Sequence, residues 1–173
     1  MTTHSLVWFK RDLRIRDHAP LAAAQTLDSA LALFVIEPEW LVSPECDPQH
    51  VAFTLDCLSE LRADLALLGL PLWVHVGTAT SALNEVHTQF AFTHLLSHEE
   101  TGSGWSYTRD LAVAAWCKQQ SVEWHEWTQT GVVRRLKSRF GWAGNWSARM
   151  DTAPSVVEGS FKATTGEIGR AHV

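Results

Sequence analysis

Short apolar runs alternate with helical patterns along the first 127 residues, and this alternation constrains the fold more than any other feature. Five segments are typical of strands, at residues 6–9, 30–36, 71–77, 93–98 and 122–127. The first two are continuous apolar runs, which indicate strands covered on both faces. The last alternates with period two, as expected of an edge strand with one wetter face.

These strands are separated by four helical patterns, at residues 19–27, 48–68, 79–91 and 105–120. The second pattern is the best bounded, because Asp47 and Pro48 supply an N-cap and a first-turn proline, and Gly69 supplies a C-cap. Strands alternating with helices predict an α/β fold of Rossmann-like, doubly wound type. The expected core is a five-stranded parallel sheet with helices on both faces and right-handed crossovers.

Two connecting segments are less regular. Residues 38–49 contain three prolines among polar residues and are expected to form a loop. Residues 132–139 are basic and compatible with a helix. Their cations are expected to form a solvated face rather than a nucleic-acid patch, since they lack aromatic stacking partners. These cations are Arg134, Arg135, Lys137 and Arg139.

Composition limits the class of protein. The 173 residues are 46% hydrophobic and 19% charged, which suits one domain with a sizeable core. A net charge of -5 argues against a generally basic nucleic-acid-binding surface. The three cysteines are widely spaced and predict neither a disulfide framework nor a zinc site. Since no signal peptide or long apolar run is present, a cytoplasmic, membrane-free protein is expected. A monomer is also expected.

The turn after the first strand is rich in charge. Lys10, Arg11, Arg14 and Arg16 lie close together where that strand ends. Ligands of doubly wound sheets bind at the carboxyl ends of the strands, so this cluster is a candidate contact for an anion or a ring carbonyl of a bound ligand. The alternative is a salt-bridge set with Asp12 and Asp17 that shapes the turn. For Asp12 and Arg14 we favour this structural role.

Two motifs carry a family resemblance. The string Val7-Trp-Phe-Lys-Arg-Asp-Leu-Arg-Ile-Arg-Asp-His18, followed by Ala-Pro-Leu-Ala-Ala-Ala, resembles the N-terminal signature of the DNA photolyase/cryptochrome family. Gly102-x-Gly-x-x-x-x-Arg109-Asp110 is similar to the region where photolyases carry an Arg-Asp pair. The resemblance covers about residues 5 to 150. It implies the strand order 3-2-1-4-5, which the alternation alone does not fix.

This strand order brings three further carboxylates toward the first strand. Glu37 ends the second strand, and Glu99 and Glu100 follow the fourth. Together with Lys10 and Arg11 they are expected to line a crevice for an antenna chromophore, although a solvated loop acid is as good an explanation for any one of them. Arg109 and Asp110, like Asp12 and Arg14, are assigned to turn structure.

The identity of an antenna stays open among deazaflavin, folate and flavin. The helix after the second strand begins Pro48-Gln-His50, where many deazaflavin-binding relatives place an arginine. Residues 104–108 contain no acid, although folate-binding relatives place a glutamate there. No catalytic residue and no metal ligand is predicted. His94 and His98 are expected to be ordinary strand residues.

The resemblance implies the N-terminal domain of a deoxyribodipyrimidine photolyase-like protein, a lyase that repairs pyrimidine dimers in DNA with blue light and FAD. This part would bind the antenna and dock the helical FAD domain of the same parent chain, which contacts damaged DNA. Alone it is expected to be inactive. The alternatives are a cryptochrome photoreceptor and a free-standing nucleotide- or flavin-binding module, which should lack a large exposed apolar face.

The expected domain limits are residues 1–135 for the α/β domain and 136–166 for the start of an interdomain linker. Residues 167–173, Glu-Ile-Gly-Arg-Ala-His-Val, are similar to the translation of a widely used sequencing adapter. We therefore expect a non-native tail on a truncated reading frame.

Overall fold

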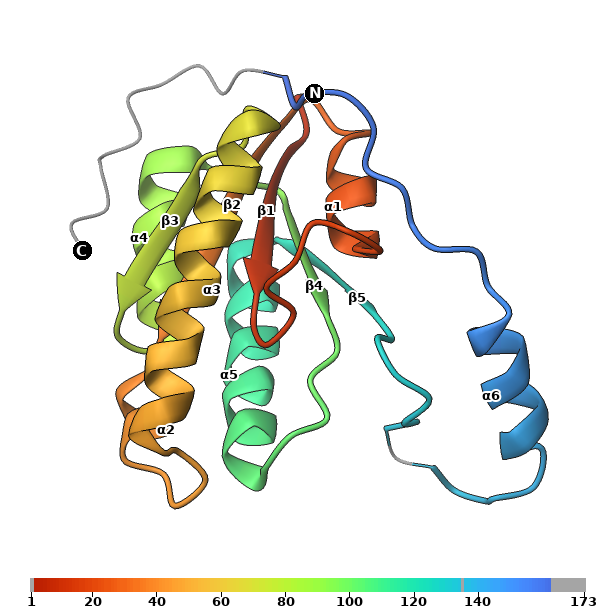
Figure 1. Cartoon of the computed structure of the whole chain (residues 1–173). Coiled ribbons are helices and arrows are strands. Elements are labelled where there is room, and N and C mark those ends of the chain that lie inside the picture. Colours follow the sequence, from red (N-terminus) through yellow and green to blue (C-terminus); the bar gives the residue numbers. More distant parts are fainter. Residues whose placement is uncertain (1, 135, 163–173) are drawn as a thin grey trace.

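One parallel sheet forms the centre of the molecule. The computed structural model describes residues 2–134 and 136–162. The strands are β1 (His4–Phe9), β2 (Ser29–Ile36), β3 (Leu72–Val76), β4 (His94–His98) and β5 (Glu123–Trp127). Their order is β3-β2-β1-β4-β5 and every pairing is parallel. Both the predicted α/β class and the predicted strand order are confirmed, with β5 at an edge (Figure 1).

Helices cover both faces of this sheet. Helices α1 (Ala19–Ala24) and α3 (Pro48–Leu67) pack on one face, and α4 (Ala79–Phe90) and α5 (Gly104–Gln120) pack on the other. Alternate residues of β1 pack into the two hydrophobic cores, one on each face of the sheet. Leu6 and Trp8 contact the α4–α5 side, whereas Val7 and Phe9 contact the α1–α3 side. This is why the first apolar run has no polar face.

Helix α3 begins and ends where its capping residues predict. The Asp47 carboxylate accepts from the backbone N–H of Gln49 at 2.8 Å, and His50 returns a contact to the Asp47 backbone N–H, which completes a capping box. Gly69 follows the last turn with a φ of +73°, in the left-handed region that glycine tolerates best. The predicted caps are confirmed.

Two irregular segments differ from prediction. Within residues 38–49 a short helix, α2 (Pro38–Leu41), replaces part of the expected loop, because the fixed φ of Pro38 suits a first helical turn. The described part of 132–139 contains no helix, since the side chain of Arg134 is tied to the sheet. The next helix is α6 (Trp142–Met150), which begins after Gly141 at a φ of +78°.

Residues 151–162 return from α6 along α1 to the domain (Figure 1). The Phe161 side chain is buried in the α1–α3 core, and its backbone N–H donates to the Leu68 carbonyl at 2.7 Å. The side chain of Gln25 makes two hydrogen bonds to the backbone of Glu158. We call residues 151–162 the strap. Although this segment falls within the predicted interdomain linker, it packs against the α/β core.

Replacing Phe161 by Ala is expected to release the strap. The substitution removes the buried apolar side chain at its end and leaves the partly buried Val157 and a few hydrogen bonds to hold the segment. Limited proteolysis should then cut residues 151–162 faster while the α/β core survives. Val156→Ala is the control, because Val156 is exposed. Equal cleavage of both variants would contradict a docked strap.

Among the described residues, no helix is both long and apolar enough to cross a membrane. The predicted adapter-derived tail, residues 167–173, lies outside the described residues.

Candidate functional site

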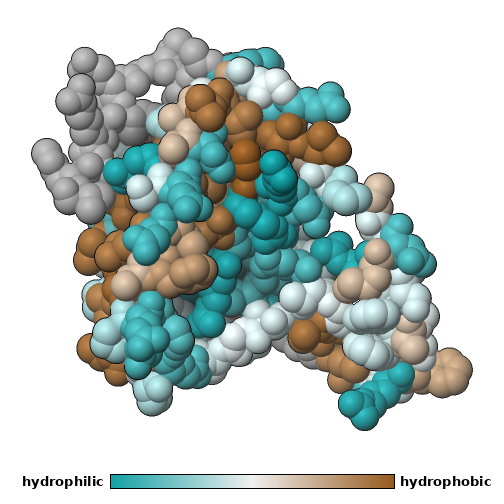
Figure 2. All heavy atoms as spheres, in the orientation of Figure 1, coloured by the Kyte–Doolittle hydropathy of each residue, from teal (hydrophilic) through white to brown (hydrophobic). Residues whose placement is uncertain are grey.

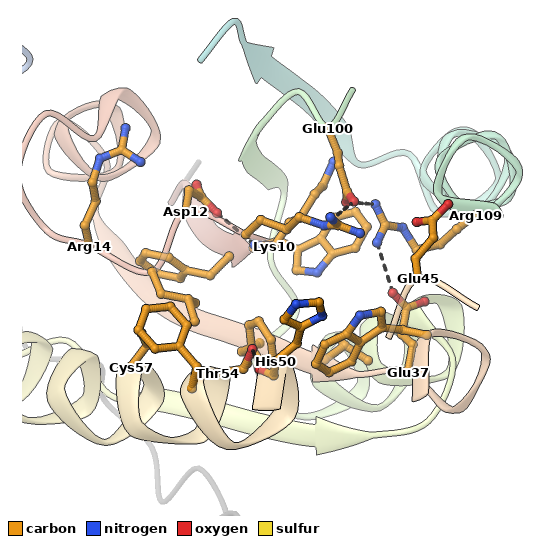
Figure 3. A pocket seen from close by; sticks show the side chains of 18 of the residues that line it. Lys10, Asp12, Arg14, Glu37, Glu45, His50, Thr54, Cys57, Glu100 and Arg109 are labelled. Atoms are coloured by element: carbon orange, nitrogen blue, oxygen red, sulfur yellow. Dashed lines mark hydrogen bonds and ion pairs between the residues drawn. The ribbon is translucent and has the colours of Figure 1, made fainter. Parts of the chain in front are cut away.

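A cavity of about 560 Å³ opens at the carboxyl ends of β1 and β2. This is a usual size for a small-molecule site, which spans roughly 300–1,000 Å³. The turn after β1 forms its floor, α3 forms one wall, and the residues after β4 together with α5 form the opposite wall (Figure 3). The lining residues are Trp8, Phe9, Lys10, Arg11, Asp12, Leu13, Arg14, Phe34, Val35, Glu37, Trp40, Glu45, His50, Phe53, Thr54, Cys57, Glu100, Trp105 and Arg109.

The sheet topology explains the location of this cavity. The chain leaves β1 toward α1 on one face and reaches β4 from α4 on the other face. Such a change of direction in a doubly wound sheet leaves a crevice at the carboxyl ends of the central strands. The charged turn after β1 therefore borders the crevice, as its sequence position predicts.

Arg109 organises the charges of the α5 wall. Its guanidinium donates to Glu37 Oε2 at 3.0 Å, to Glu100 Oε2 at 2.6 Å and to Asp110 Oδ1 at 2.8 Å. Burial alone would lower the pKa of Arg109, but these carboxylates outweigh burial and raise its pKa. The guanidinium also lies over the Trp8 and Trp105 rings, at 4.9 and 5.1 Å from their centroids. Arg109 is therefore held rigidly in one position.

Glu37 is a buried carboxylate at the edge of the cavity. Burial raises the pKa of Glu37, and the neighbouring Arg109 opposes that rise. Because Glu37 lies at the end of β2 and faces the cavity, it can act as a hydrogen-bond acceptor for a ring N–H.

Lys10 is buried and already has partners. Its Nζ lies 3.4 Å from Asp110 Oδ2 and 3.3 Å from Glu126 Oε1. It also lies 4.5 Å from the Trp8 ring centroid, in a cation–π arrangement. Lys10 borders the cavity, but its ammonium is directed toward β5 and α5 by these contacts. A ligand in the cavity would therefore contact the aliphatic part of the Lys10 side chain more readily than its ammonium group.

Arg134, which follows β5 in the chain, joins the same network of ion pairs. It donates to Asp110 Oδ2 at 3.1 Å, to Glu126 Oε2 at 2.9 Å and to the Glu100 carbonyl at 2.6 Å. The prediction of a solvated basic face is therefore wrong for Arg134. Sequence reasoning missed it because a single arginine in a basic run gives no sign of its distant partners.

Asp12 is fixed by two histidines rather than by the arginines of its turn. His98 Nδ1 donates to Asp12 Oδ2 at 2.6 Å, and His18 Nε2 lies 2.9 Å from the same oxygen. The Asp12 carboxylate also accepts from the Lys10 backbone N–H at 2.8 Å. Burial would raise the pKa of Asp12, but the contacts with His18 and His98 hold it well below its usual range. The expected salt-bridge set is thus wrong in its partners.

The tautomer of His18 follows from its position before α1. Its Nδ1 accepts from the Leu21 backbone N–H at 3.2 Å, so the proton of the neutral ring is on Nε2, beside Asp12. That N–H is poorly aligned with the oxygen and makes no well-formed hydrogen bond. Burial lowers the pKa of His18, which favours the neutral ring. The group is a buried polar network beneath the β1 turn.

The remaining predicted site residues divide between the cavity and the surface. Arg11 and Arg14 border the cavity, where Arg11 Nε contacts Glu100 Oε1 at 3.0 Å. Arg14 donates to Gln129 and to the carbonyls of its own turn. Glu99 does not line the cavity, and its backbone N–H pairs with β5 instead.

Sequence reasoning considered only the first turn of α3 and missed the rest of the wall that this helix forms. His50, Thr54 and Cys57 project from α3 into the cavity at intervals of four and three residues (Figure 3). This spacing places them on one face of the helix. The sequence does contain a signal for this wall, because small and polar residues recur on the face of the helix that is directed toward the sheet. The short helix α2 adds Trp40 to the rim.

Residues 5–137 match the family model described as DNA photolyase. The chain belongs to the DNA photolyase family. It is a photolyase-family N-terminal α/β domain. A deoxyribodipyrimidine photo-lyase of Salmonella typhimurium is 38% identical over 100 residues, covering 57% of this chain and 21% of that protein. A 31.6 kDa protein of Synechococcus sp. is 29% identical over 162 residues, covering 86% of this chain and 56% of that protein.

Solved structures share the fold of this photolyase-family chain. The photolyase of Sulfolobus tokodaii, described as holding two FAD molecules, is 22% identical with a TM-score of 0.76, covering 94% of this chain and 39% of that one. A Synechocystis cryptochrome is 15% identical with a TM-score of 0.75, covering 99% and 39%. The chain therefore spans about a fifth to just over half of these relatives' lengths.

Proposed function

We propose that this chain is the antenna-binding and docking domain of a blue-light-dependent DNA photolyase. In this proposal the cavity at the ends of β1 and β2 holds a planar light-harvesting chromophore. A helical FAD-binding domain elsewhere in the parent protein supplies the catalytic flavin. The observation that carries the proposal is the cavity itself, which lies in a family domain and is ringed by aromatic side chains and paired charges.

The chemistry of the lining supports a planar heterocycle. Four cations and four carboxylates line the cavity, so its formal charge is balanced. Aromatic rings of Trp40, Phe53 and Trp105 offer stacking surface, while Glu37 and Glu100 offer acceptors for ring N–H groups. Arg11, whose side chain is 56% exposed, is available at the rim for a ring carbonyl or a phosphate. A neutral ring with polar edges fits this set better than a polyphosphate.

Exposed apolar side chains support docking of a further domain. They gather in residues 132–150, where α6 stands apart from the sheet (Figure 1) and apolar atoms lie on its surface (Figure 2). These residues are Val132, Val133, Leu136, Phe140, Trp142, Trp146 and Met150. A free-standing module should not expose such a set, whereas a domain that packs against a helical partner should.

In the parent protein, light-excited reduced FAD would donate an electron to a pyrimidine dimer, the two inter-base bonds would break, and the electron would return to the flavin. No residue of this chain is assigned to that step, so the isolated chain should not repair dimers. A cryptochrome photoreceptor is the second candidate, because the relatives include a chloroplastic/mitochondrial cryptochrome DASH of Arabidopsis thaliana, 26% identical over 106 residues. Dimer repair by the full-length parent distinguishes the two.

Chromophore binding by this chain tests the antenna proposal directly. FMN, an 8-hydroxy-5-deazaflavin and methenyltetrahydrofolate would each be titrated while the quenching of their fluorescence is followed. At least one should bind. Thr54→Trp, which fills the cavity, should weaken that binding by tenfold or more, whereas the neighbouring Leu55→Trp, outside the lining, should not. Failure of all three to bind, or equal binding by both variants, would refute the proposal.

A further inference from the structure

Three potential metal ligands meet on the sheet surface near the amino-terminal ends of β4 and β5, away from the cavity. The register pairs His94 with Glu123, and the next residue on the same face of β5, His125, is paired with Leu96. Side chains two apart on a strand lie on the same face, so all three point to one side of the sheet. The His94 and His125 rings are stacked, with centroids 5.9 Å apart.

The separations of their ligand atoms suit a single transition-metal ion. Glu123 Oε2 lies 3.8 Å from His94 Nε2 and 3.3 Å from His125 Nε2. All three ligand atoms fall within 4.8 Å of one another. A tetrahedral zinc ion with bonds of about 2.0–2.1 Å holds its ligands roughly 3.3 Å apart. Glu123 and His125 are exposed and His94 is half-buried, so small rotations of the first two side chains suffice to approach that geometry.

The hydrogen bonds of Thr93 leave the His94 Nε2 lone pair free. The Thr93 hydroxyl donates a hydrogen bond to the His4 carbonyl, with Oγ1 and the carbonyl oxygen 3.2 Å apart. Thr93 Oγ1 then accepts from His94 Nδ1, which lies 2.8 Å away. In the neutral ring the proton is therefore on Nδ1, and two acceptors, His94 Nε2 and the Glu123 carboxylate, face each other. A cation between them resolves this conflict, and the Thr93 contact is the kind that orients a metal-binding histidine.

The buried group Asp12, His18 and His98 is the other set of this type in the described part of the chain, and its geometry is different. Its contacts of 2.6 and 2.9 Å are hydrogen-bond lengths, shorter than the spacing of two ligands on one metal. His18 Nδ1 is also occupied by its helix cap, so metal binding at Nε2 would require an imidazolate. The two clusters therefore have different roles.

We propose that His94, Glu123 and His125 form a binding site for a divalent transition cation, with Zn²⁺ as the expected occupant. Two imidazole nitrogens and one carboxylate are ligands that zinc prefers, and water completes the coordination at this exposed position. A bound ion would join the edge strand β5 to β4. This proposal departs from the expectation from sequence that His94 is an ordinary strand residue. The proposal is independent of antenna binding.

Isothermal titration calorimetry of the untagged chain with ZnCl₂ at about pH 7.5 tests this site, because metal affinity depends on pH and the pH must be held constant. One equivalent of Zn²⁺ should bind. Glu123→Gln and His125→Asn should each weaken binding by tenfold or more, and both positions are exposed enough to leave the fold intact. Thr93→Val should weaken binding by about tenfold through loss of the orienting contact.

His75→Asn is the matched control, because His75 also pairs with a carboxylate, that of Glu85, at 3.1 Å, but belongs to no three-residue group among the described residues. This variant should bind Zn²⁺ as tightly as the unaltered chain. Absence of zinc binding would overturn the proposal. Zinc binding that survives both Glu123→Gln and His125→Asn would also overturn it, and would assign these contacts to ion pairs with protonated histidine.

Discussion

Replacing Arg109 by Met should lower the free energy of unfolding by about 3–5 kcal/mol, the usual cost of removing one partner from a buried ion pair. Arg109 is the cation shared by Glu37, Glu100 and Asp110, all of which are buried or nearly so. Methionine keeps much of the volume but removes the charge, so three carboxylates lose a common donor. Urea unfolding followed by tryptophan fluorescence measures the loss.

Arg11→Met is the control for this prediction. Arg11 also pairs with Glu100, but its side chain is more than half exposed, so the loss should stay within about 1 kcal/mol. The deficit of Arg109→Met should shrink as the pH falls. An acid whose folded-state pKa is raised, as that of Glu37 already is, regains stability on protonation, below its folded pKa. Equal losses in the two variants would show that Arg109 does not neutralise this group.

The sequence predicted the fold well because local signals agreed with the tertiary structure. Continuous apolar runs gave the buried strands, and the capping residues Asp47 and Gly69 gave the limits of α3. Strands and caps depend on residues near one another in the chain, where periodicity and turn chemistry are visible. The location of the cavity at the ends of β1 and β2 also needed the strand order, which the family resemblance implied and the alternation alone did not.

Features that depend on distant residues were not predicted. Asp12 and His98 are 86 residues apart, and the Asp12 turn alone suggested arginines as partners. Arg134 was assigned to solvent because its carboxylate partners lie on β5 and α5. Phe161 sits in a segment without periodicity, although its side chain completes a core. In each case the partner is set by the packing of elements rather than by local pattern.

Replacing Asp12 by Ala should cost about 2–6 kcal/mol of unfolding free energy, since each buried donor left unsatisfied costs about 1–3 kcal/mol. The two donors that bond the carboxylate are the Lys10 backbone N–H and His98 Nδ1. Asp28→Ala is the control. Asp28 likewise accepts from a backbone N–H and a side chain, both of Thr3, but it is fully exposed, and its loss should be smaller.

The pH dependence of the unfolding free energy shows whether Asp12→Ala destabilises the chain by removing the carboxylate charge or by disturbing the packing. The pKa of Asp12 is lowered in the folded state, so its stabilisation is present above the ordinary carboxyl pKa of about 4 and is lost as the pH falls below it. His18, whose pKa is also lowered, adds a loss that begins below about pH 6.5 and persists in the variant. The unaltered chain should therefore lose stability more steeply than Asp12→Ala below about pH 4. Parallel curves there would mean that Asp12 acts through packing alone, and that its charge is not what holds the β1 turn beneath the cavity.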